Sequence, residues 1–72
     1  MKTYTITRNG EKIGAVYGDS MRGAAIEFAT RLAKQFAVID TLADNTYQPG
    51  IWHPKLQRFE PIAEPFAVEG GR

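Results

Sequence analysis

The segment from Ser20 to Phe36 has a clear helical period, and it constrains every fold open to this chain. At about 100° per residue, apolar side chains gather on one broad face and polar ones gather on the other. The apolar face holds Met21, Ala24, Ala25, Ile26, Phe28, Ala29, Leu32, Ala33 and Phe36. Asp19 or Ser20 can cap the first turn, because a short oxygen-bearing side chain accepts from its free amides. A wide, alanine-rich face suits close packing on a sheet, so we expect a central helix lying on one sheet.

Residues 2–17, before this helix, have the pattern of a β-hairpin. Threonine alternates with apolar residues up to Arg8, and Asn9-Gly10 is the dipeptide that best tolerates the positive φ angles of a type I′ turn. A two-residue loop predicts the pairs Arg8–Glu11, Ile6–Ile13, Tyr4–Ala15 and Lys2–Tyr17. The apolar residues of the first strand then meet mainly apolar partners on one face, so turn chemistry and hydrophobic register agree.

Further strands are expected after the helix. The β-branched run from Val38 to Ala43 predicts a third strand. Turn-forming residues then surround Tyr47. Residues 51–62 predict a second hairpin, which reverses at Pro54-Lys55-Leu56 and is anchored by aromatic residues such as Trp52.

The predicted fold is α+β, a two-layer β-β-α-β-β arrangement with one helix packed on a mostly antiparallel four-stranded sheet. The 72 residues suffice for one domain of this size. We place that domain at residues 1–66 and expect a flexible tail at residues 67–72, next to proline and glycine. The predicted core comprises Tyr4, Ile6, Ile13, Ala15, Ala25, Phe28, Leu32 and Phe36.

Composition excludes several classes of protein. Hydrophobic residues are 43% of the chain and charged residues 24%, values typical of a folded domain and too apolar for intrinsic disorder. The sequence contains no cysteine, which rules out disulfides and thiolate metal ligands. No apolar run reaches the roughly 20 residues of a membrane span, and the first residues lack the pattern of a signal peptide. We therefore expect a cytoplasmic protein with no membrane contact.

The sequence offers no catalytic constellation. His53 is the one histidine, and no aspartate or glutamate clusters beside it as a metal site or a general base would need. Ser20, the one serine, stands at an N-cap position and has no nucleophile elbow around it. Residues 18–23 lack the Lys-Ser/Thr ending of a phosphate-binding loop. We expect no enzymatic activity, no metal and no cofactor.

Basic residues form one candidate binding surface. Residues 1–36 hold six bases against three acids, a balance of +3, whereas residues 37–72 hold three bases against five acids, a balance of −2. A basic patch along the outer face of the helix would neutralise phosphates or meet an acidic protein. The patch would comprise Arg22, Arg31 and Lys34, with Arg8 and Lys12 from the first hairpin. The alternative is an ordinary solvated helix face, because Glu27 lies in its middle.

The second candidate surface lies in the segment that contains the tryptophan. Tyrosine and tryptophan in a loop-rich hairpin are typical interface anchors. The expected partner-binding residues here are Tyr47, Trp52, His53 and Leu56. In the alternative interpretation, Ile51 and Trp52 close the open end of the core, and the sequence leaves both interpretations open.

In its organisation, the chain resembles small phage and mobile-element proteins, including several anti-CRISPR families. The likeness spans most of the chain without a diagnostic motif. It rests on the short length, the first hairpin, the Gly18-Asp19-Ser20 entry into an alanine-rich helix, and the trailing strands. It implies a stoichiometric inhibitor that binds and blocks a larger host protein or ribonucleoprotein complex. Whether the chain also pairs with a second copy stays open.

The chain also resembles ubiquitin-like β-grasp proteins, because a hairpin, a helix and later strands end in Gly70-Gly71. Arg72 follows the two glycines, so a conjugating terminus would need trimming, and Glu69 stands where ubiquitin has a basic residue. Two alternatives to an inhibitor therefore remain. They are a nucleic-acid-binding module that uses the basic helix face, and a ubiquitin-like protein.

Overall fold

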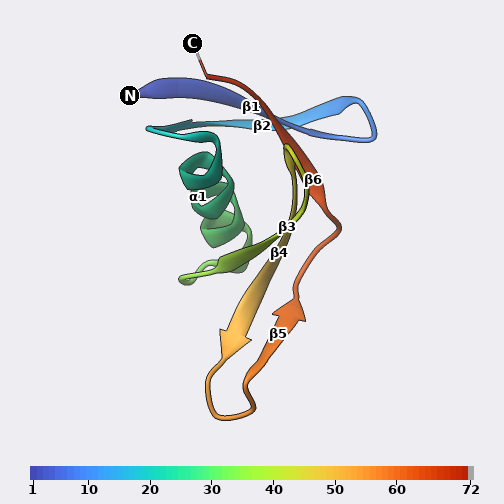
Figure 1. Ribbon diagram of the computed structural model, residues 1–72. Helices are drawn as coiled ribbons and strands as arrows, with labels where there is room; N and C mark the ends of the chain where they lie inside the picture. Colours follow the sequence, from blue (N-terminus) through green and yellow to red (C-terminus); the bar gives the residue numbers. More distant parts are fainter. Residues whose placement is uncertain (72) are drawn as a thin grey trace.

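Figure 1 shows the protein as a computed structural model, which describes residues 1–71. Over those residues, the chain forms one α-helix and six β-strands. In chain order they are β1 (Lys2–Arg8), β2 (Glu11–Gly18), α1 (Met21–Ala33), β3 (Val38–Ala43), β4 (Thr46–His53), β5 (Arg58–Pro61) and β6 (Phe66–Gly70). The strand pairings are antiparallel, and α1 lies across one face of the sheet (Figure 1). The prediction of a helix on an antiparallel sheet is confirmed, whereas the four-stranded β-β-α-β-β arrangement is wrong.

Strand β6 lies in the middle of the sheet, although it comes last in the chain. The strand order is β2-β1-β6-β4-β3, and β5 also pairs with β4. Ile6 of β1 lies opposite Val68, and the first two residues of β6 pair with β4. Residues 67–72 were expected to be a tail, but the chain is part of the sheet up to Gly70, and Arg72 lies outside the described residues. Hydrogen bonds to two distant strands fix β6, and the local composition does not reveal them.

The first hairpin forms as expected, but its register shifts by one residue on β2. Asn9 and Gly10 take positive φ angles of 54° and 80°, as the tight turn requires. Beyond the two pairs next to the turn, a bulge moves the partners. Ile6 therefore lies opposite Gly14 rather than Ile13.

This shift decides which side of β2 is buried. Ile13 and Ala15 are exposed, and Val16 is buried in their place, so both predicted core residues are wrong. The physical reason is the contact between β2 and α1. A Cβ atom on Gly14 would lie 2.8 Å from Cε1 of Phe28, so the bulge brings a glycine to the place where the ring needs space.

Helix α1 is shorter than predicted and ends at Ala33. Ser20 caps its start, where the side-chain Oγ accepts a hydrogen bond from the Gly23 amide at 3.0 Å. Lys34 takes a left-handed conformation with a φ angle of 59°, which ends the helix without a glycine. Phe36 therefore lies beyond the helix with 77% of its surface exposed, and its prediction as a core residue is wrong.

The core lies between α1 and the sheet. Its central cluster comprises Tyr4, Ile6, Val16, Ala24, Ala25, Tyr47, Phe66 and Val68. The predicted members confirmed in this cluster are Tyr4, Ile6 and Ala25. Phe28 is half-buried and packs on the cluster, with its ring edge-on to Phe66 at a centroid distance of 5.1 Å. Leu32 was also predicted to be buried, but it lies on the exposed side of the last helical turns.

Strand β4 pairs with β3, β5 and β6 and contains a proline. Residues 48–50 have turn composition, so the sequence predicted turns on both sides of Tyr47 rather than a strand. Strand β4 tolerates Pro49 because the backbone of this residue faces away from β3. Its carbonyl accepts a hydrogen bond from the Ile62 amide at 3.1 Å on that side. An N–H group, which proline lacks, would point to the same side, so the pairing with β3 loses no donor.

Candidate functional site

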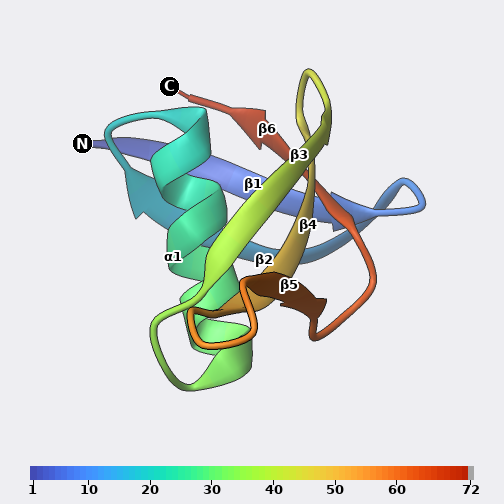
Figure 2. The same ribbon diagram turned by 60° about the horizontal axis from the view of Figure 1, so that its bottom comes forward.

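Strands β4 and β5 form a hairpin that extends beyond α1 (Figure 1), and Figure 2 brings its turn forward. We call residues 51–60 the β4–β5 arm. Trp52 pairs with Phe59 and His53 pairs with Arg58, so the predicted second hairpin is confirmed. The first half of β4 lies between β3 and β6, and this pairing fixes the direction in which the arm leaves the domain.

Trp52 lies on the sheet face opposite α1. Side chains alternate along a strand, so Tyr47 and Pro49 face the core while Trp52 faces away from it. The exposed fraction of Trp52 is 50%. Phe59 lies directly opposite on β5, and its ring packs over Gly50, on the same face of β4 as Trp52. Trp52 therefore does not close the core, and its outer half is accessible to a partner.

His53 connects the two strands of the arm. Its Nε2 atom contacts a carboxylate oxygen of Glu60 across the hairpin, and both side chains are partly exposed. The described residues contain no group of three or more His, Asp and Glu side chains placed to hold a metal ion. The pair therefore braces the arm, and sequence alone did not reveal Glu60 because register decides which carboxylate His53 meets.

Leu56 lies at the turn of the arm with 65% of its surface exposed. An open hollow of about 430 Å³ is lined there by His53, Pro54, Lys55 and Leu56. Lys55 and Arg58 are also exposed, so apolar and positively charged side chains share the tip. Nothing in the sequence distinguishes these two cations, because charged residues at a turn are common on any protein surface.

Tyr47 is buried in the core rather than exposed on the arm. Its exposed fraction is 5%, and its ring centroid lies 6.4 Å from that of Phe66. The residue belongs to the part of β4 that packs beneath α1. In contrast to the prediction, Tyr47 offers no surface to a partner.

The helix cations do not form one patch. The predicted members on the helix were Arg22, Arg31 and Lys34. Arg22 donates to Oγ1 of Thr41 on β3 at 3.4 Å, whereas Arg31 donates to the Ala15 carbonyl on β2 at 3.3 Å. Because β3 and β2 are opposite edges of the sheet, the two arginines lie on opposite flanks of α1. Arg31 also pairs with Glu27 at 3.4 Å, and Lys34 lies past the helix at its C-cap.

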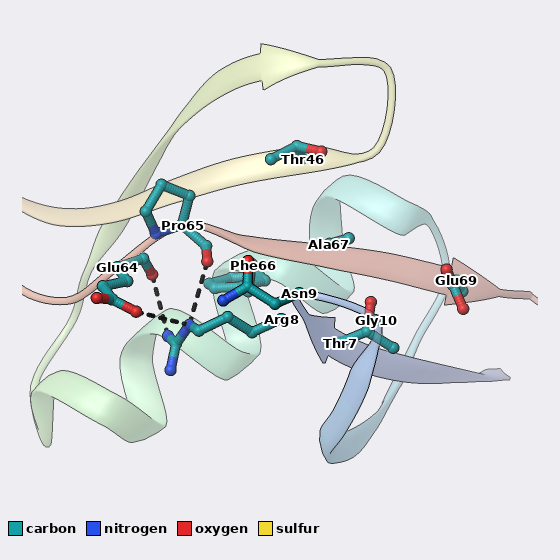
Figure 3. Close-up of a pocket in the computed structure, with 10 residues that line it drawn as sticks. All are labelled: Thr7, Arg8, Asn9, Gly10, Thr46, Glu64, Pro65, Phe66, Ala67 and Glu69. Atoms are coloured by element: carbon teal, nitrogen blue, oxygen red, sulfur yellow. Dashed lines mark hydrogen bonds and ion pairs between the residues drawn. The ribbon is translucent and has the colours of Figure 1, made fainter.

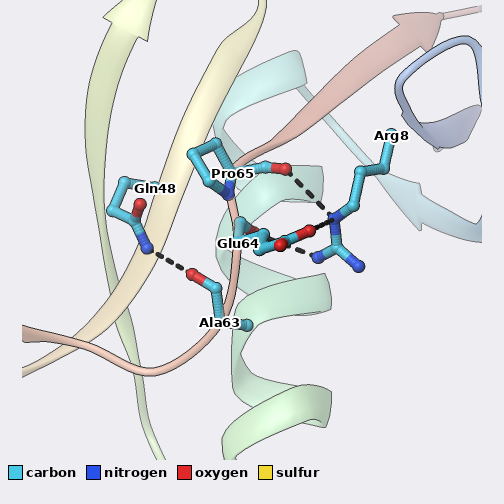
Figure 4. A network of polar contacts seen from close by, with 5 residues as sticks. All are labelled: Arg8, Gln48, Ala63, Glu64 and Pro65. Atoms are coloured by element: carbon cyan, nitrogen blue, oxygen red, sulfur yellow. Dashed lines mark hydrogen bonds and ion pairs between the residues drawn. The ribbon is translucent and has the colours of Figure 1, made fainter.

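A second hollow, of about 580 Å³, lies beside Arg8 (Figure 3). The Arg8 guanidinium donates to the Pro65 carbonyl at 3.2 Å and to the Glu64 carbonyl at 3.0 Å, and it pairs with the Glu64 carboxylate at 3.8 Å. Gln48 donates to the next carbonyl, that of Ala63, at 2.6 Å (Figure 4). Arg8 and Gln48 therefore hold the chain where it crosses from β5 to β6, and this role accounts for the cation in the hollow.

Comparisons with protein-family models, with curated proteins and with solved structures found no match. None of the helical segments within residues 1–71 is long and apolar enough to cross a membrane. The β4–β5 arm carries three of the expected contact residues, with His53 and Trp52 on opposite faces of β4 and Leu56 at the turn.

Proposed function

We propose that this protein is a small non-enzymatic interaction protein that binds and blocks a larger complex of a host cell, as phage inhibitors of the anti-CRISPR type do. The target is a protein or ribonucleoprotein complex in the host cytoplasm. The observation that carries the proposal is the 50% exposure of Trp52 on the sheet face opposite α1. Leu56, at the tip of the arm, is a second exposed apolar side chain, with an exposed fraction of 65%.

The exposed part of Trp52 is large enough to anchor an interface. A half-exposed tryptophan can still bury on the order of 100 Å², worth about 2–3 kcal/mol at about 25 cal/mol per Å². This value lies in the range of interface hot spots. A partner pocket that accepts the indole would therefore gain affinity from one side chain of this arm.

The arm is ordered before any partner arrives. The Phe59 ring packs over Gly50 of the neighbouring strand, and the contact between His53 and Glu60 ties the two strands together. A binding segment that is already ordered loses less conformational entropy on association. This order supports the arm as an interface.

The charge of the tip supports an acidic target surface. Lys55 and Arg58 lie on either side of Leu56 in the sequence, and the nearby Glu60 already contacts His53. Complementary charge speeds the encounter and selects the partner more than it adds affinity. We therefore place the target among proteins with an acidic groove beside an apolar pocket.

The two alternatives receive less support. A nucleic-acid module would need a continuous basic face, but Arg22 and Arg31 lie on opposite flanks of α1. A ubiquitin-like conjugate would need an extended diglycine segment. Here Gly70 ends β6, and the Gly71 amide donates to the Thr3 carbonyl at 3.1 Å.

The test is a pull-down from a bacterial lysate with the tagged chain, followed by mass spectrometry. Trp52→Ala should remove a captured partner while leaving the melting temperature nearly unchanged. Tyr17→Ala is the matched control, because Tyr17 is also an exposed aromatic side chain but lies on β2. Recovery of the same partner by Trp52→Ala, or its loss with Tyr17→Ala as well, would contradict an interface on the arm.

A further inference from the structure

The main strand order ends in β2 and β3, and these two edges differ in how well they are protected against further strand pairing. A third edge strand, β5, belongs to the β4–β5 arm. Strand β2 forms one edge, and a side chain of α1 occupies part of its backbone. Its register shift at Ile13 and its charged residues have counterparts on β3, at Leu42 and Asp40. The difference is Arg31, which donates to the Ala15 carbonyl at 3.3 Å. Another strand would have to displace Arg31 before it could pair with β2 there.

Strand β3 forms the other edge, and it is open. Within residues 1–71, β3 pairs only with β4. Residues 40–43 of β3 are all exposed. Among residues 1–71, no arginine covers the backbone of this edge as Arg31 covers that of β2, because Arg22 donates to the side chain of Thr41.

The position of Pro49 shows which backbone groups of β3 point outward. Its carbonyl accepts from Ile62, so the backbone of Pro49 faces away from β3. Ile39 lies opposite Pro49 and Thr41 lies opposite Tyr47, two residues along. In an antiparallel pair, residues opposite each other both point inward or both point outward. Ile39 and Thr41 therefore direct their N–H and C=O groups away from the sheet.

We propose that the β3 edge binds an extended segment of a partner protein as an additional strand, with a basic side chain of that segment opposite Asp40. This surface is separate from the β4–β5 arm and goes beyond the function proposed above. The outward groups of Ile39 and Thr41 supply the strand pairing, as in known strand-addition complexes. Asp40 lies between them, is exposed, and makes no ion pair with any of the residues that the structure describes.

The charge of Asp40 argues against a second copy of this chain as the occupant. A symmetric antiparallel pair that uses both outward residues would place Ile39 opposite Thr41 of the other copy. Asp40 would then face Asp40 in a non-hydrogen-bonded pair, where Cα atoms are only about 4.5 Å apart. Like charges directly opposite each other destabilise a sheet, whereas a lysine or arginine opposite Asp40 stabilises it.

Leu42 adds an apolar contact next to this charge. The register shift between Thr41 and Ala43 leaves Leu42 out of the regular pairing with β4, and its exposed fraction is 53%. The partner segment would therefore carry a basic residue with an apolar residue one or two positions away on either side.

The test uses amide chemical shifts of the ¹⁵N-labelled chain and a seven-residue capped peptide of alternating threonine and valine with a central lysine. A peptide with a central glutamate and an N-methylated lysine peptide are the matched probes. The lysine peptide should shift the amides of Ile39 and Thr41 and bind about two- to five-fold more tightly than the glutamate peptide. The N-methylated peptide should bind more weakly than its parent, and Asp40→Lys should reverse the charge preference.

Several results would overturn the proposal. One is the absence of any shift at residues 39–41 at millimolar peptide. Another is equal binding of the parent and N-methylated peptides, which would mean that no strand pairing occurs. A third is the observation of a dimer by sedimentation, if the Thr41→Pro substitution dissociates that dimer. A second copy of the chain would then occupy the β3 edge. Thr41→Pro suits this purpose, since the amide it removes points away from β4.

Discussion

The guanidinium of Arg8 donates to the carbonyl oxygen of Pro65 at 3.2 Å and so joins two parts of the chain that are 57 residues apart. A second bond, to the Glu64 carbonyl at 3.0 Å, comes from the same side chain. Together they fix the crossover that delivers β6 into the middle of the sheet (Figure 4). One side chain at the end of β1 thus helps to position the last strand.

Arg8→Ala should lower the free energy of unfolding by about 1–3 kcal/mol, because two hydrogen bonds from a charged donor are lost. Lys12→Ala is the matched control, since it removes an exposed cation from the same hairpin and should change stability by less than about 0.5 kcal/mol. Urea unfolding of both variants measures the difference. Equal stability of the two variants would mean that the crossover does not depend on Arg8.

Gly14→Ala should destabilise the protein by about 1–3 kcal/mol through overpacking. The new methyl group would meet Cε1 of Phe28 at 2.8 Å, and the ring also packs edge-on against Phe66, which limits its movement. Thermal melting measures the loss, which corresponds to roughly 4–8 °C per kcal/mol for a domain of this size. Phe28→Leu in the Gly14→Ala background should cost less than the sum of the two single changes.

A wild-type melting temperature for Gly14→Ala would contradict the account of the β1–β2 register. In that case, the bulge would not be set by the contact between β2 and α1. Additive losses in the double variant would show that the two side chains do not share this space.

Truncation after Pro65 should unfold the chain. It removes Phe66 and Val68, two of the buried core residues, and exposes the edges of β1 and β4. A domain this small has a stability of only about 3–5 kcal/mol, less than the loss of two large core side chains. Far-ultraviolet circular dichroism measures the outcome. A folded truncated chain would contradict the central position of β6.

Local signals in the sequence were sufficient for part of the fold. Asn9-Gly10 predicted the first turn and Ser20 predicted the start of α1, because both depend on neighbouring backbone groups only. Two features depended on distant contacts and were not predictable in this way. The bulge on β2 depends on its contact with Phe28 of α1. Strand β6 depends on its pairing with other strands, whereas Pro65 and Gly70 in its neighbourhood predict a flexible tail.

In the candidate site, too, features set by neighbouring residues were predictable and features set by distant contacts were not. Trp52 was placed on a hairpin correctly, because the turn at residues 54–56 lies next to it. The turn composition of residues 48–50 predicts an exposed Tyr47, yet these residues continue β4, and Tyr47 is buried in the core. Arg22 and Arg31 were grouped on one helix face, but nine residues at about 100° each leave them half a turn apart.

The most direct test of the proposed interface uses the fact that the chain has one tryptophan. Labelling with 5-fluorotryptophan gives a single ¹⁹F resonance, which reports on the environment of Trp52 alone. In the isolated protein, this resonance should respond to exchange of H₂O for D₂O, because half of the side chain is exposed. When the partner captured from the lysate is added, the resonance should shift, broaden and lose that solvent response. A resonance that keeps its position and its solvent response in the complex would show that Trp52 does not contact the partner.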